Sequence, residues 1–261
     1  MPYLSLVINV DTRHQRDEFG GENLLGVCNE DFLTFGIENK IAAFEGFDKE
    51  VIVCIDEHLP ISEPVLKYIR NITDAVIIRK HTNEPSFNCY NYLRALFMAS
   101  GDIICHIDQD TNIFVSGKEY LEEMIGHLDN YSFVSYPSHW TPKAVDDLSF
   151  GKRTWASTRF FFCNQDTLKL DELTACVKEP EYGYAKYGDS PRRTNWLEHY
   201  LTLCNNDSCF YPPIEPEKGL IFSWAKYEQW TLRRLNELPY NEVVAWVGSK
   251  GGIVYPVDVY C

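Results

Sequence analysis

The sequence is poor in positive charge and contains no long apolar run. Its 261 residues include 24 Lys and Arg against 38 Asp and Glu, which gives a formal net charge of −14. Nucleic acids and anionic membrane surfaces are polyanions that such a chain would repel, so we expect neither as a partner. No stretch approaches the ~18 consecutive apolar residues of a membrane-spanning helix, so we expect no transmembrane segment.

Patterns typical of a disulfide scaffold, a zinc site or a signal peptide are also missing. The nine cysteines are odd in number, and no two have C-x-x-C spacing. Several lie in apolar runs such as residues 51–55, where cysteine behaves as a small hydrophobic residue. The apolar residues 4–10 follow no basic region and soon reach Asp11, which favours a buried first strand over a signal peptide. We therefore expect reduced, buried thiols in a soluble, cytoplasmic protein.

The first half of the chain alternates short apolar runs with helical patterns. A hydrophobic content of 45% is enough for a sizeable core, and the length suits one domain. Alternation of strands and helices predicts an α/β fold with a mostly parallel sheet covered on both faces. The expected strands are residues 4–10, 51–55, 75–78 and 102–107, and the expected helices lie near residues 33–44, 64–69 and 87–100.

The most informative motif is Asp108-Gln109-Asp110, which directly follows an apolar run. Carboxylates at i and i+2 point to the same side of an extended chain. Ligands of open α/β sheets bind outside the carboxyl ends of the strands, where this pair would lie. Mg²⁺ and Mn²⁺ are commonly held by one or two carboxylates together with substrate phosphates. The alternative is a solvated turn, which the preceding apolar strand disfavours.

Three segments resemble the nucleotide-binding blocks of GT-A-fold glycosyltransferases of the family-2 type. They are residues 4–11, residues 51–56 and the run A-S-G-D-I-I-C-H-I-D-Q-D at residues 99–110. The resemblance implies a Rossmann-like, mostly parallel sheet flanked by helices, with an adjoining acceptor-side subregion. It also implies a nucleotide-sugar donor and a Mn²⁺ or Mg²⁺ cofactor.

The resemblance assigns roles to six residues near the expected strand ends. Asp56 would contact the nucleotide base, Asp108 would face the ribose or the metal, and Asp110 would ligate the metal. The donor pocket would be lined from the end of the first strand by Asn9, Asp11 and Thr12.

The second half resembles the acceptor side of the same family. Residues 156–168 resemble a strand and turn that line the acceptor, and residues 196–203 resemble the helix start that carries the catalytic base. The family's Glu-Asp pair is Glu198-His199 here, so Glu198, His199 or the nearby loop residue Asp189 is the candidate base.

Two arginines lie just before this helix. Arg192 and Arg193 could clamp the donor diphosphate, because guanidinium groups match phosphate geometry. A solvated pair of loop charges is the alternative. We expect residues 1–115 to form the nucleotide-sugar-binding half and residues 116–261 the acceptor-binding half of one domain.

The leading interpretation is a metal-dependent glycosyltransferase that transfers a sugar to a hydroxyl of a glycan or another acceptor, with inversion. Transfer with retention of configuration is an alternative. The absence of a Q-x-x-R-W motif argues against a processive synthase. A nucleotidyltransferase of related fold is an alternative, although no Gly-rich phosphate loop follows the first strand. A catalytically silent nucleotide- or glycan-binding module is another, because Asn91 and Arg94 are out of register with the family's Arg-Asn pair.

Overall fold

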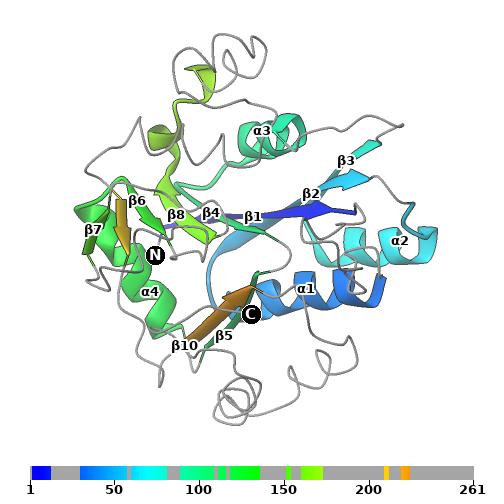
Figure 1. Ribbon diagram of the computed structural model, residues 1–261, viewed down its shortest axis with the longest axis horizontal. Helices are drawn as coiled ribbons and strands as arrows, with labels where there is room; N and C mark the ends of the chain where they lie inside the picture. Colours follow the sequence, from blue (N-terminus) through cyan, green and yellow to red (C-terminus); the bar gives the residue numbers. More distant parts are fainter. Residues whose placement is uncertain are drawn as a thin grey trace, which may run out of the picture.

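A central mixed sheet organises the computed structural model (Figure 1). Its eight strands lie in the order β3-β2-β1-β4-β8-β6-β9-β7. The structure describes residues 2–12, 30–57, 60–80, 89–108, 111–115, 118–135, 151–153, 160–172, 209–211 and 219–223. The strands of the sheet are β1 (Leu4–Asp11), β2 (Lys49–Glu57), β3 (Ala75–Lys80), β4 (Ile103–Asp108), β6 (Phe133–Ser135), β7 (Gly151–Arg153), β8 (Phe160–Asn164) and β9 (Cys209–Tyr211).

The half of the sheet built from the first part of the chain is parallel. Strand β1 pairs in parallel with β2 and β4, and β2 pairs in parallel with β3. Strand β8 then runs antiparallel to β4, and β6 runs antiparallel to β8. The expected mostly parallel α/β sheet is confirmed, and it takes strands from both sides of residue 115.

Helices cover both faces of the sheet, as β-branched and apolar strands require. The helices are α1 (Glu30–Ala43), α2 (Glu63–Ile72), α3 (Cys89–Met98) and α4 (Glu119–Gly126). Figure 1 shows α3 on one face and α1 and α4 on the other. Within the described residues no helix combines the length and the apolarity needed to cross a bilayer.

The two-residue period of the strands sends alternate side chains to different layers. Leu6 and Ile8 of β1 belong to the large core beneath α1 and α4, together with Phe162 of β8. Val7 and Asn9 project to the other face, which α3 covers with the buried Ala95 and Leu96. Polar residues of the parallel strands therefore collect on the α3 face.

A second, two-stranded sheet was not expected from the sequence. Strand β5 (Thr111–Val115) follows the D-x-D motif and pairs antiparallel with β10 (Gly219–Ser223). Asn39 of α1 fixes β5, because its side-chain Nδ2 donates to the Ile113 carbonyl at 3.0 Å and its Oδ1 accepts the Ile113 amide at 2.7 Å. The side-chain amide of Asn39 thus makes the two backbone hydrogen bonds that a neighbouring strand would otherwise make with Ile113. Hydrophobic periodicity does not predict such a contact.

The turn between α3 and β4 is closed by a glycine that touches β1. The Gly101 amide donates to Ser5 Oγ at 2.8 Å. A Cβ atom at Gly101 would lie 2.5 Å from the Ser5 nitrogen and 2.8 Å from the Leu4 carbonyl carbon. Backbone atoms cannot move aside as a flexible side chain does, so this position requires glycine.

We expect Gly101→Ala to lower the free energy of unfolding by about 1–3 kcal/mol, because overpacking forces the backbone of β1 to shift. Gly126→Ala is the matched control, since its Cβ would meet nothing within 4 Å. An alanine at that helical position should be neutral or stabilising by up to about 1 kcal/mol. Urea unfolding of both variants measures the difference, and equal stability of the two would contradict the close approach of Gly101 to β1.

Three cysteines of the central strands, Cys54, Cys105 and Cys163, are free and buried. Desolvation by burial raises the pKa of each thiol above its ordinary value, and the carboxylates of Asp56 and Asp108 raise the pKa of Cys54 further. The folded protein therefore keeps these thiols protonated at a pH where the unfolded chain ionises them.

This difference should make the protein less stable in alkali. The unfolded chain loses its thiol protons above its ordinary pKa of about 8.5, so stability present below that pH falls by up to about 1.4 kcal/mol per pH unit for each thiol. Urea unfolding between pH 7 and pH 10 measures this slope. Cys163→Ala should show a shallower decline than the unaltered protein, and an identical slope would refute the assignment.

Candidate active site

The strand order reverses beside β1, which creates the crevice where open α/β sheets bind ligands. The chain builds β1, β2 and β3 in one direction and then returns to place β4 on the other side of β1. Because these strands are parallel, their carboxyl ends meet at one edge. The candidate site lies at this edge, on the face covered by α3.

Three neighbouring strands contribute one row of side chains at this edge. Asn9 is the register partner of Cys54 on β2 and of Asp108 on β4. The Cys54 thiol lies 3.5 Å from two acceptors, Asn9 Oδ1 and the Ile8 carbonyl oxygen, and Asn9 Nδ2 donates to Asp108 Oδ1 at 3.3 Å. The raised pKa of Cys54 keeps its thiol in the protonated form that can donate. The row therefore links β2, β1 and β4 through their side chains.

Asp108 is the accessible carboxylate of this row, since 30% of its side chain is exposed. His106, two residues earlier on the same strand and face, has its Nε2 at 3.1 Å from Asp108 Oδ1. The imidazole is 2% exposed and stacks on Phe161 of β8, with ring centroids 5.2 Å apart and planes inclined by 25°. Asp108 is thus held by one side chain from β1 and another from β4.

The sequence pattern did not single out His106, which contacts Asp108. Its signal was present, because its imidazole interrupts the otherwise apolar residues 103–107 and it shares the two-residue period of Asp108. A buried histidine in a strand is common enough that this signal becomes informative only when its hydrogen-bond partner is known.

The other predicted donor-site residues near this edge are buried or held by the backbone. Asp56 is fully buried at the end of β2. Thr12 continues the pairing of β1 and β2, because its amide and its Oγ1 donate to the Asp56 carbonyl at 3.0 and 3.4 Å. Asp11 pairs in register with Asp56, and only its backbone is described.

The remaining predicted site residues lie outside the described part of the chain, so their roles stay predictions. They are Asp110, Asp189, Arg192, Arg193, Glu198 and His199.

The described residues contain no group of three His, Cys, Asp or Glu side chains that could hold a metal. Asp108 nevertheless offers a partly exposed carboxylate of the hard-oxygen type that Mg²⁺ and Mn²⁺ prefer. This residue fits a divalent cation that completes its coordination with other ligands.

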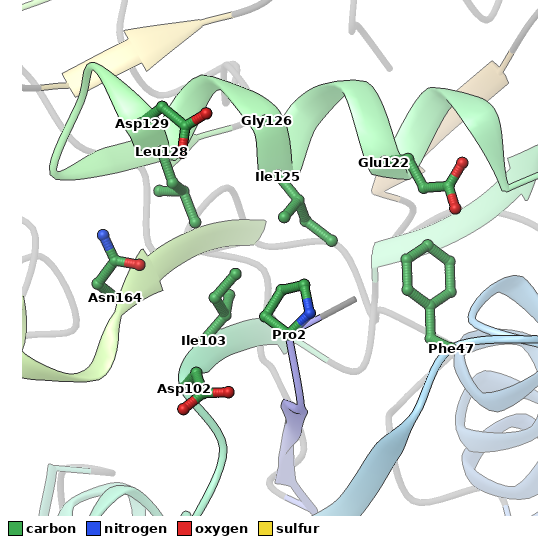
Figure 2. Close-up of a pocket in the computed structure, with 10 residues that line it drawn as sticks. All are labelled: Pro2, Phe47, Asp102, Ile103, Glu122, Ile125, Gly126, Leu128, Asp129 and Asn164. Atoms are coloured by element: carbon green, nitrogen blue, oxygen red, sulfur yellow. The ribbon is translucent and has the colours of Figure 1, made fainter.

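A cavity of about 480 Å³ lies at the opposite, amino edge of the parallel strands (Figure 2). Ile125 and Leu128 from α4 and η1 (His127–Asp129) point toward Ile103 at the start of β4. The charged residues among its lining are acidic, and no Lys or Arg is among the described residues that line it. A diphosphate would be repelled there, so this cavity is not the candidate donor site. Its carboxylates belong to Asp102, Glu122 and Asp129.

No protein-family model matches the sequence, and no curated protein matches it by sequence. Solved structures do match the fold. The mannosyltransferase PcManGT from Pyrobaculum calidifontis, in complex with GDP-Man and Mn²⁺, has a TM-score of 0.51 and 12% identity over 98% of this chain. The glycosyltransferase GlyE of Streptococcus pneumoniae has a TM-score of 0.51 and 10% identity, also over 98%. This chain spans 66% and 65% of those two chains, slightly less than two thirds.

A cytidylyltransferase from Leptospira borgpetersenii is similar over the whole length of both chains. It has a TM-score of 0.50 and 14% identity, covering 99% of each chain. Likeness at such low identity establishes architecture and not activity. The strand order around β1, the helices on both faces and these similarities together show that the chain has the GT-A fold.

Proposed function

We propose that the protein is a metal-dependent glycosyltransferase that moves a sugar from a nucleoside-diphosphate sugar to a hydroxyl of a glycan or another acceptor. The observation that carries this proposal is the accessible Asp108 carboxylate, held by Asn9 and His106 at the strand-order reversal. In the sequence, Asp110 follows two positions later and supplies the second carboxylate of the motif.

In this proposal Asp108 and Asp110 hold Mn²⁺ or Mg²⁺ with the donor diphosphate. The bound cation supplies stabilisation of the negative charge that grows on the departing diphosphate. Because the protein has a formal net charge of −14, an anionic donor would be repelled unless positive charge, such as a cation, lies at the site. The mannosyltransferase of similar fold binds GDP-Man and Mn²⁺, which adds support.

The protein's own side chains would bind the donor and move one proton. Asp56 recognises the nucleotide base. The donor pocket is lined by Asn9, Asp11 and Thr12. The donor diphosphate is clamped by Arg192 and Arg193. Glu198, or else His199 or Asp189, accepts the proton of the acceptor hydroxyl. The acceptor oxygen then bonds to the anomeric carbon while the bond from that carbon to the diphosphate breaks, with inversion.

This assignment gives each half of the chain one task. Residues 1–115 bind the donor and residues 116–261 bind the acceptor, and transfer is non-processive. The free, buried thiols favour a reducing compartment such as the cytoplasm.

A nucleotidyltransferase is the second candidate, because the cytidylyltransferase of similar fold matches this chain over the full length of both. Such an enzyme would release pyrophosphate from a nucleoside triphosphate, whereas a glycosyltransferase releases a nucleoside diphosphate. Assaying both products with the same preparation separates the two reactions. The release of neither product, with nucleotide binding retained, would indicate a catalytically silent module.

We expect a cognate nucleotide-sugar to raise the Tm in the presence of Mn²⁺ and to have little effect without it. A ligand at about 100 times its Kd stabilises the folded state by about 2.7 kcal/mol. Asp110→Ala should abolish the Mn²⁺-dependent shift. The matched control is Asp129→Ala, which removes an exposed carboxylate at the opposite edge of the sheet. An unchanged shift in Asp110→Ala would overturn the metal assignment.

Glu198→Gln should preserve the donor-induced shift and lower kcat by about 10²- to 10⁴-fold, the usual contribution of a general base. The measurement is nucleoside-diphosphate release in the presence of acceptor. His199→Asn and Asp189→Asn are parallel variants that identify the base, since the true base variant alone should lose turnover while retaining donor binding. Full activity in all three variants would exclude the proposed base set.

A further inference from the structure

We propose that His106 is a positioning residue that, together with Asn9, fixes Asp108 so that carboxylate oxygen Oδ2 is presented to the metal and the donor. The proposal rests on the function proposed for Asp108 and extends it to a residue two positions upstream. His106 would not touch substrate or metal, and would act only through the orientation of Asp108.

The direction of the hydrogen bonds carries this inference. Within the described part of the chain, Asn9 Nδ2 and His106 Nε2 lie 3.3 and 3.1 Å from the same oxygen, Asp108 Oδ1. Two donors on one oxygen leave Oδ2 as the oxygen available for a ligand, and the side chain is 30% exposed. Among the described residues, the carboxylate is therefore hydrogen-bonded through Oδ1.

Each donor is itself held in place by a neighbouring strand. Asn9 Oδ1 faces the Cys54 thiol at 3.5 Å, and its Nδ2 faces Asp108. His106 is 2% exposed and stacked on Phe161, so its ring has little freedom to rotate. A carboxylate oxygen accepts hydrogen bonds, so the His106 tautomer that bonds to Asp108 Oδ1 carries a proton on Nε2.

This arrangement is the one expected of residues that orient a metal-binding carboxylate by bonding to the oxygen that does not face the metal. Carboxylates that ligate metals are themselves hydrogen-bonded, and removing such a partner typically weakens metal binding about 10- to 100-fold. A histidine that served packing alone would need only its ring, because Phe161 contacts the ring face. The hydrogen bond and the ring can therefore be tested separately.

Two substitutions separate these contributions. His106→Phe keeps an aromatic ring against Phe161 but removes the hydrogen bond to Asp108. His106→Gln loses the ring but keeps an N–H group near the position of Nε2. Phe162→Leu is the matched control for a loss of core packing, because Phe162 is fully buried on the opposite face of the sheet.

The measurement is the Kd of Mn²⁺ in the presence of UDP and, in parallel, GDP, from the electron paramagnetic resonance signal of free Mn²⁺. We expect His106→Phe to raise this Kd about 10- to 100-fold. His106→Gln and Phe162→Leu should leave it within about threefold, even where urea unfolding shows lower stability. Wild-type affinity in His106→Phe, or an equal loss in His106→Gln, would overturn the proposal.

Failure to fold is also informative. His106→Leu replaces His106→Phe if the latter does not fold, and failure of both apolar variants would assign the hydrogen bond to folding and overturn the proposal.

Failure of the proposed function gives a different result. The unaltered protein would then bind Mn²⁺ with neither nucleotide, and crystal structures of the variants would decide the positioning role. Asp108 should keep its orientation in His106→Gln and turn in His106→Phe. An unchanged Asp108 in His106→Phe would contradict the proposal.

Discussion

The candidate site depends on the parallel register that joins β1 to β2 on one side and to β4 on the other. This register places Asn9 beside both Cys54 and Asp108, so that one hydrogen-bonded row crosses three strands. A slip of one residue would send Asn9 to the opposite face and break the row. Both faces of β1 are buried, and a slip would place Asn9 in the apolar core, so the observed register is favoured.

The two faces of the sheet have different roles. The face beneath α1 and α4 is filled by apolar side chains and contributes the large core. The α3 face carries the polar groups, with Ser5 and Glu50 hydrogen-bonded near the amino edge and Asn9 and Asp108 at the carboxyl edge. Glu50 also accepts the Ser100 amide at 2.6 Å, which secures the end of α3 beside the start of β4. The polar site is thus supported by a rigid apolar layer on the other side.

The parallel strands could be predicted from the sequence, because each is a short apolar run with a clear boundary. It did not give β5, whose neighbours are β10, over 100 residues away, and the side chain of Asn39. It predicted Asp108 as a site residue from the D-x-D pattern and did not single out His106, since a buried histidine has no distinctive pattern of its own. Contacts of these kinds depend on residues distant in the chain, which local periodicity does not describe.

The sequence by itself determined the acidity of the chain, the alternation of strands with helices, and the presence of paired carboxylates after an apolar strand. Tertiary structure decided the order of the strands and the orientation of Asp108. Asn9 and Asp108 are 99 positions apart, and nothing in either local pattern shows that they meet. Their contact arises because backbone hydrogen bonds set the register between β1 and β4, and pairing of this kind exists only in the folded chain.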